Sequence, residues 1–258
     1  MTILECQNLT VEIGSTLNRS YLVKNLDLHL SPGQVLCILG QNGSGKTSLL
    51  RVLAGLNYIT GGHISISGKD ITQYKRKNIA KMLGLVAQTE NDPFPLTVYD
   101  FALAGRNPYL GLLEWESHDD KEHTLDALEK TSLQHKQKQL VQTLSGGERK
   151  RLSIARLLTQ DPEIMLWDEP TNHLDPAQQN QILDIVLELK EKQKAQIIAL
   201  HDVNHAALIA THILFLYQDD SWEFGTAESM LTAEKLSHLY QTPFSALNHK
   251  ENTLFSFH

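Results

Sequence analysis

The residues of this chain with the clearest chemistry lie between Gly40 and Thr47, in the stretch GQNGSGKT. A glycine, four residues and then Gly-Lys-Thr is the pattern of a loop whose backbone N–H groups surround a phosphate chain. In such a loop the lysine reaches the β- and γ-phosphates, and the threonine hydroxyl binds Mg²⁺. We therefore predict a nucleotide site formed by Gly40, Gln41, Asn42, Gly43, Ser44, Gly45, Lys46 and Thr47.

Two carboxylates, Asp168 and Glu169, come directly after the apolar run Ile164–Trp167. The run has the length of a buried strand, so both carboxylates fall at a strand end, beside the predicted phosphate loop. Hard cations prefer oxygen ligands, which suits Asp168 to Mg²⁺, and Glu169 can orient or deprotonate an attacking water. An isolated Asp-Glu pair would be interpreted as a solvated strand end, but this pair accompanies a phosphate loop.

A second anion site is predicted downstream of the first, in the segment Leu144–Glu148, LSGGE. Ser145 can donate a hydrogen bond to phosphate, and Gly146 and Gly147 expose backbone N–H groups at the start of a helix. The chain therefore carries two phosphate-binding segments.

The elements that must hold these residues follow from hydrophobic periodicity. A buried strand is predicted at 35–39, directly before the phosphate loop, and a helix at 48–54, directly after it. Alternating apolar positions predict antiparallel strands at 3–13 and 21–30. Two further short strands are predicted at 63–67 and 83–87.

Residues 89–143 differ from the rest of the chain and predict a mostly helical insert. Helical spacing occurs at 98–104 and 121–132, around a loop-like stretch at 114–120. Beyond the insert the predicted elements alternate between helix and strand, which favours a parallel sheet with right-handed crossovers. They are a helix at 147–159, a strand at 164–167, a helix at 177–192 and a strand at 195–200.

Composition narrows the class of protein. The chain has 258 residues and a formal net charge of −7, which argues against nucleic acid as its default partner. Cys6 and Cys37 are too few for a disulfide framework, so we expect a reducing compartment. The N-terminus lacks a signal-peptide pattern and no long apolar run is present, so we expect a cytoplasmic protein that does not itself cross a membrane.

Taken in order, the motifs resemble those of the nucleotide-binding subunits of ATP-binding-cassette (ABC) transporters, over nearly the whole chain. The resemblance identifies GQNGSGKT as a Walker A loop, LSGGE as the signature and residues 164–169 as the Walker B strand. It also identifies Gln88 as the Q-loop residue, Thr171–Asp175 as the D-loop and His201 as the switch histidine.

The resemblance implies an α/β P-loop NTPase of the ABC type. The expected fold is a RecA-like core sheet with an N-terminal antiparallel β subdomain, formed by 1–88 and 144–258, and a helical subdomain at 89–143. It implies an ATPase that binds ATP and Mg²⁺, in which Glu169, His201 and Gln88 are catalytic and Gln88 also contacts the metal, with Thr47 and Asp168. Gln88 would link the γ-phosphate and Mg²⁺ to the membrane partner, and His201 would position the γ-phosphate and water against Glu169.

The expected partners also follow from the resemblance. In this family the signature of one cassette faces the Walker A loop of another, so Ser145, Gly146, Gly147 and Glu148 are expected at the ATP of a second copy, with Asp175 at the interface. The resemblance further implies two integral-membrane permease subunits, a separate substrate-binding protein, no nucleic acid, and a position on the cytoplasmic face of the inner membrane.

One element departs from the family pattern. Family members usually place an aromatic residue that stacks on adenine in the stretch corresponding to Gly14–Arg19, and none occurs here. The nearest, Tyr21, lies within a strand pattern and is interpreted as a packed residue. Adenine would then rest on Leu17 or on the aliphatic part of Arg19, and base selectivity could be loose.

The motifs favour one function over several others. A transport ATPase is favoured over a cassette acting on ribosomes or DNA, because residues 89–143 leave no room for a second cassette or a long coiled coil. A simple P-loop kinase would lack both LSGGE and the switch histidine. A cassette of an exporter or of a lipid or lipoprotein-extraction system is the alternative to an importer.

Within the importers, Ala104–Gly111 resembles the GR-x-P segment of cassettes for iron–siderophore, haem and cobalamin chelates, and Leu231–Leu236 and Leu239–Pro243 resemble the same subfamily. A simpler interpretation of the first segment is a helix end stopped by Pro108.

Apolar residues of the insert are candidates for a groove that receives a short helix of the permease, or for the insert's own core. We weigh these equally for Leu96 and Tyr99 and favour the groove for Tyr109 and Trp115. A charge at Tyr109 is expected to uncouple transport from hydrolysis. The whole set is Phe94, Leu96, Tyr99, Tyr109, Leu110, Leu112 and Trp115.

Overall fold

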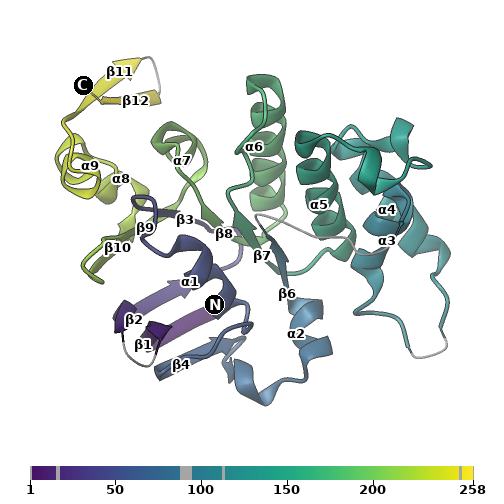
Figure 1. Ribbon diagram of the computed structural model, residues 1–258, viewed down its shortest axis with the longest axis horizontal. Helices are drawn as coiled ribbons and strands as arrows, with labels where there is room; N and C mark the ends of the chain where they lie inside the picture. Colours follow the sequence, from purple (N-terminus) through teal and green to yellow (C-terminus); the bar gives the residue numbers. More distant parts are fainter. Residues whose placement is uncertain (1, 16–17, 88–94, 112–113, 250–251, 258) are drawn as a thin grey trace.

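The computed structural model of this chain describes residues 2–15, 18–87, 95–111, 114–249 and 252–257. Figure 1 shows two sheets with a helix between them, further helices on the opposite face of the larger sheet, and a hairpin near the C-terminus. Predictions that concern Leu17, Gln88, Phe94 and Leu112 lie outside the described residues.

The smaller sheet is antiparallel and is formed by the first part of the chain. Its order is β2-β1-β4-β5, and each neighbouring pair is antiparallel, which confirms the predicted N-terminal antiparallel strands. The strands are β1 (Leu4–Ser15), β2 (Asn18–Leu30), β4 (Gly61–Ile66) and β5 (Lys69–Asp70).

The larger sheet has the order β10-β9-β3-β8-β7-β6 and is parallel except for the pair β9 and β10. Since β3 ends at the phosphate loop and β7 ends at Asp168, both motifs lie at the carboxyl edge of the sheet, where ligands of such sheets bind. The strands are β3 (Val35–Leu39), β6 (Leu83–Val86), β7 (Ile164–Asp168), β8 (Ala195–Ala199), β9 (His212–Leu216) and β10 (Trp222–Thr226).

Helices cover both faces of the larger sheet. Along β3 the side chains of Leu36 and Ile38 belong to one buried cluster, and those of Val35, Cys37 and Leu39 belong to another. The alternation of the pleat thus places apolar side chains on both faces, which explains the uninterrupted apolar run in the sequence. The helices of the core are α1 (Lys46–Leu53), α2 (Arg76–Met82), α5 (Gly146–Gln160), α6 (Pro176–Glu191) and α7 (Val203–Ile209).

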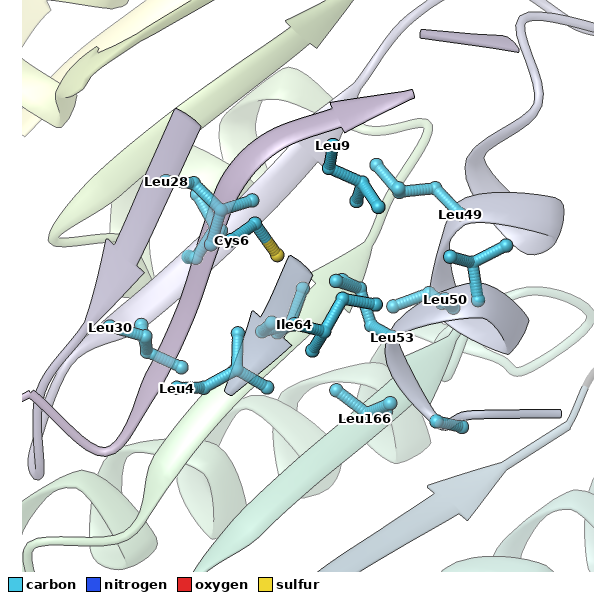
Figure 2. Packing of buried hydrophobic residues seen from close by; sticks show 14 of the residues in the cluster. Leu4, Cys6, Leu9, Leu28, Leu30, Leu49, Leu50, Leu53, Ile64 and Leu166 are labelled. Carbon is cyan, nitrogen blue, oxygen red and sulfur yellow. The ribbon is translucent and has the colours of Figure 1, made fainter. Parts of the chain in front are cut away.

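The first of these clusters joins the two sheets through α1. Figure 2 shows Leu50 and Leu53 of α1 directed toward Leu4 and Ile64 of the antiparallel sheet. This packing holds the helix that starts at the phosphate loop in place, and thereby fixes the position of the end of the loop.

Residues 98–143 contain short helices around a third buried cluster, which includes Phe101 and Leu128. The helices are α3 (Val98–Leu103) and α4 (His118–Lys130), with 3₁₀ turns η2 (Ala104–Arg106), η3 (Gln134–Lys136) and η4 (Val141–Thr143). The predicted loop at 114–120 is partly wrong, because α4 already begins at His118. Ser117 and Asp120 form a capping box that starts the helix there.

The C-terminal part adds α8 (Ala227–Met230), α9 (Ala233–Tyr240) and a hairpin of β11 (Phe244–His249) and β12 (Asn252–Phe257). The Asn204 side chain holds the hairpin on α7, since it accepts from Phe255 N at 2.8 Å and donates to Phe255 O at 3.1 Å.

Both cysteines, Cys6 and Cys37, are free and buried. Burial raises the pKa of each thiol above its ordinary value, and the charges of Glu5 and Asp27 add to the effect at Cys6. Among the described residues, no helix combines the length and the apolar character that a membrane span requires.

Candidate nucleotide-hydrolysis site

The phosphate loop requires glycine at two positions. Gly45, which precedes α1, has a φ of 89°, and an added Cβ there would lie 1.8 Å from Leu22 Cδ1. At Gly40 an added Cβ would lie 2.5 Å from the carbonyl oxygen of Leu216. The loop therefore follows its course because neither position carries a side chain.

The Lys46 ammonium is enclosed by this loop. Its Nζ donates to the carbonyl oxygens of Gly40 at 2.8 Å and Gln41 at 3.2 Å, and the residue is 5% exposed. Burial lowers the pKa of Lys46, whereas the charges of Glu169 and Asp168 act in the opposite direction. A cation is thus held at the loop by weak neutral acceptors that phosphate oxygens can replace.

Two further features of the loop fit a bound phosphate. The hydroxyl of Ser44 is buried and has no hydrogen-bond partner among the described residues. A buried hydroxyl without a partner is costly, and a phosphate oxygen would satisfy it. The space that a Cβ at Gly43 would occupy has no atom within 4 Å, so the loop is open there.

Thr47 and Asp168, which lie far apart in sequence, meet at the edge of the sheet. Thr47 Oγ1 donates to Asp168 Oδ1 at 3.0 Å. Asp168 is buried, and burial raises the pKa of its carboxyl group, although the Thr47 hydrogen bond opposes the shift. A hydroxyl and a carboxylate in contact supply the oxygen donors that Mg²⁺ prefers, so the residues present fit this metal.

Glu169, the next residue, is held from two sides. Its Oε1 contacts His201 Nε2, and its Oε2 accepts from Asn172 Nδ2 at 2.6 Å. The backbone is also fixed, because Glu169 N donates to the carbonyl oxygen of Ala199 at 3.1 Å in β8. The predicted pair Glu169 and His201 is therefore brought together, although 32 positions separate the two residues.

The segment LSGGE begins α5. Ser145 and Glu148 form a capping box, with Ser145 N donating to Glu148 Oε2 at 2.9 Å and Glu148 N donating to Ser145 Oγ at 3.3 Å. An ion pair with Lys136, together with the Ser145 hydrogen bonds, lowers the pKa of Glu148 to about 2. Glu148 thus orders the start of the helix. At Gly146 an added Cβ would have no atom within 4 Å, so the backbone is open there.

Two predicted site residues use their side chains elsewhere in this structure. Asp175 caps α6 by accepting from Gln178 N at 2.9 Å, so a role at an interface stays a prediction. Gln41 Nε2 donates to the carbonyl oxygen of Leu239 in α9 at 3.0 Å, so its side chain is bound to an element outside the loop.

The structure adds three residues that the sequence analysis missed. Asn172 holds Glu169, Lys136 holds Glu148, and Lys150 Nζ donates to the carbonyl oxygen of Asp168 at 2.7 Å. Only Asn172 had a sequence signal, because it lies three positions after Glu169 and one after Thr171 in a turn that contains Pro170.

The GR-x-P segment is structural in its first residues. Arg106 Nε pairs with Asp120 Oδ1 at 2.6 Å, Arg106 Nη1 donates to the carbonyl oxygen of Thr159 at 3.2 Å, and the guanidinium lies 4.1 Å from the centre of the Tyr109 ring. The segment therefore fastens α4 to the end of α5.

The apolar candidates of the insert differ in their exposure. Leu96 and Tyr99 pack against the third cluster, whereas Trp115 is 88% exposed. Tyr109 is half-buried and donates to the carbonyl oxygen of Lys81 at 3.3 Å. The interpretation of Tyr21 as a packed residue is wrong, since it is 39% exposed with Lys24 Nζ 4.1 Å from its ring centre.

The chain is similar in sequence to known proteins. The family model described as ABC transporter matches residues 23–172. The ferric enterobactin transport ATP-binding protein FepC of Escherichia coli is 36% identical over 220 residues, which cover 85% of this chain and 81% of FepC. The iron(3+)-hydroxamate import ATP-binding protein FhuC of Bacillus subtilis is 30% identical over 233 residues, which cover 90% of this chain and 87% of FhuC.

A solved structure matches over the full length. It belongs to an inward-facing ABC transporter of proposed metal-chelate type, with a TM-score of 0.83 and 28% identity, and the match covers 100% of this chain and 97% of that one.

Proposed function

The chain belongs to the ABC transporter family, and from this premise we propose that it is the ATP-hydrolysing subunit of a transporter that imports a metal chelate. One arrangement supports hydrolysis: Thr47 is hydrogen-bonded to Asp168, and Glu169 contacts His201 at the same edge of the sheet. Import of a chelate is supported by the relatives, which are named for ferric enterobactin and iron–hydroxamate transport.

In the proposed reaction the phosphate loop binds the phosphates of ATP, and Lys46 turns from its loop carbonyls to the β- and γ-phosphates. Thr47 and Asp168 would hold Mg²⁺, which neutralises charge on the phosphates when it is bound. Glu169 accepts a hydrogen bond from the attacking water and takes its proton, and His201 orients the γ-phosphate. Gln88 is proposed to complete the metal site.

We infer that hydrolysis requires two copies of this chain. Ser145, Gly146 and Gly147 offer a hydroxyl and backbone N–H groups at a helix N-terminus, which suit the γ-phosphate bound by a second copy. Residues 89–143 are proposed to form a helical subdomain on the core of 1–88 and 144–258. Two permease subunits, a separate substrate-binding protein and a position on the cytoplasmic face of the inner membrane complete the proposal.

The function is tested by uptake in a strain that lacks this subunit. Uptake of a radiolabelled ferric siderophore, haem or cobalamin should be lost, return with the native chain, and stay absent with the Glu169→Gln variant. Normal uptake of all three chelates in the deletion strain would refute the substrate class, and rescue by the variant would refute the coupling to hydrolysis.

A further inference from the structure

We propose that Asn172 is a positioning residue that fixes the carboxylate of Glu169 for water activation. The inference rests on the proposed role of Glu169 and adds a residue that acts through it. Asn172 lies in the D-loop segment, for which the sequence pointed only to Asp175 at an interface.

The hydrogen bond joins the two side chains directly. Asn172 Nδ2 donates to Glu169 Oε2 at 2.6 Å, while His201 contacts the other oxygen of the same carboxylate. If His201 moves to the γ-phosphate, Asn172 still holds Oε2 and sets the plane of the carboxylate. The amide therefore selects which oxygen faces the reaction.

The local backbone fixes the position of this donor. Glu169 O accepts from Asn172 N at 3.3 Å across a turn that contains Pro170, and Glu169 itself has a φ of 50°. A non-glycine residue in the left-handed region is uncommon and is maintained by its surroundings, here by the bond from Glu169 N to Ala199 O. The donor and the carboxylate are thus held at opposite ends of one constrained turn.

Burial strengthens the contact. Glu169 is 7% exposed, and Asn172 is half-buried, so water does not freely replace the amide. A hydrogen bond to an ionised acceptor in such surroundings is stronger than a neutral one and orients both partners.

The experiment compares three substitutions at this position in the full-length chain. Asn172→Leu keeps the volume and removes the donor, Asn172→Asp keeps the shape and replaces the donor by an acceptor, and Asn172→Ser keeps a shorter donor. We expect kcat for ATP to fall roughly tenfold or more in the Leu and Asp variants, because misplacement of a reacting group by about 1 Å can cost up to 10²-fold. The Ser variant should recover part of this loss.

The KM for ATP should stay within about twofold, because the amide does not contact the nucleotide. The same changes at exposed Asn78 of α2 are the control and should leave kcat unchanged. Unchanged kcat in the Asp variant, or a loss of kcat equal in the Ser and Leu variants, would overturn the proposal.

A double substitution separates this inference from the proposed function. In single turnovers, Asn172→Leu should slow a Glu169→Gln chain by less than about twofold, because the two residues act as a unit. Additive losses would show that Asn172 acts elsewhere. If Glu169→Gln alone hydrolysed ATP normally, the proposed base would be wrong, whereas an inactive Glu169→Gln with a normal Asn172→Leu would refute the inference about Asn172 alone.

Discussion

At the scale of single residues, the phosphate loop keeps a buried cation on two neutral acceptors. Lys46 donates to the loop carbonyls of Gly40 and Gln41, so the loop fixes the position of the ammonium group. Preorganised charge of this kind stabilises a transition state without reorganisation during the reaction.

Replacing Lys46 by Ala should therefore weaken ATP binding at least about tenfold and abolish turnover, because the phosphates lose their main cation. Binding can be measured with a fluorescent ATP analogue and turnover by phosphate release. The control is Lys75→Ala, an exposed lysine before α2. Binding by the Lys46→Ala variant within twofold of the native chain would contradict the assignment.

The Glu169→Gln variant should bind ATP normally and hydrolyse it roughly 10²–10⁴-fold more slowly, since it loses general-base help. Gln keeps the size of the side chain, so the expected product is a dimer locked with ATP. Size-exclusion chromatography with ATP tests this. A variant that remains monomeric at high protein concentration would count against the predicted dimer, in which the signature of one copy faces the ATP of the other.

At the scale of elements, the sequence predicted the bounds of those helices and strands whose hydrophobic pattern is clear. Strand β3 was predicted with its observed bounds, and α5, α6 and β7 were predicted within one residue at each end, because these segments have uniform burial or clear helical periodicity. The pairing of Glu169 with His201 was expected from the order of motifs.

Contacts between distant segments were not predictable in the same way. The hydrogen bond from Gln41 to Leu239 spans 198 positions, and the sequence around neither residue indicates it. The contacts of Lys136 and Lys150 were not predicted, since a sequence does not show which carboxylate or carbonyl lies within reach of a lysine. The hairpin of β11 and β12 was missed because it is fastened by Asn204, a residue of α7.

The approach of η2 to α5 depends on Gly105. A Cβ there would lie 2.4 Å from the carbonyl oxygen of Arg156 and 2.9 Å from Gln160 N, both backbone atoms. We expect Gly105→Ala to lower the free energy of unfolding by about 1–3 kcal/mol, the usual effect of overpacking. Urea denaturation measures this, with Gly61→Ala as the control, because its Cβ would meet only ordinary contacts. Equal midpoints for both variants would refute the packing argument.

At the scale of the whole molecule, the elements that carry the two predicted phosphate-binding segments contact each other within one chain. Lys150 of α5 donates to the carbonyl oxygen of Asp168, and a Cβ at Gly147 would lie 3.2 Å from Leu174 Cδ2. The segment that carries Asn172 therefore also contacts the signature, so a second copy bound there would lie next to the residues that hold Glu169.

The exposed ring of Trp115 gives a sharper test of the proposed permease-docking surface than Tyr109 does, because Tyr109 is already packed against Arg106. Trp115→Glu should leave the basal ATPase of the isolated subunit unchanged and reduce transport and transporter-stimulated ATPase at least about tenfold, since a charge cannot enter an apolar groove. Reconstituted transporter in vesicles provides the measurement. Leu187→Glu, on the exposed side of α6, is the control. Normal transport by the Trp115→Glu variant would place the docking surface elsewhere.

The burial of both native cysteines has a practical consequence for spectroscopy. An accessible thiolate is the nucleophile that attacks a thiol reagent, whereas Cys6 and Cys37 are buried with raised pKa values. A maleimide or nitroxide label should therefore react with a cysteine introduced at an exposed position, such as Asn78→Cys, without removal of the native thiols. Pulsed electron resonance between two such labels would then report the distance between cassettes as ATP binds and is hydrolysed, in a chain whose core is unaltered.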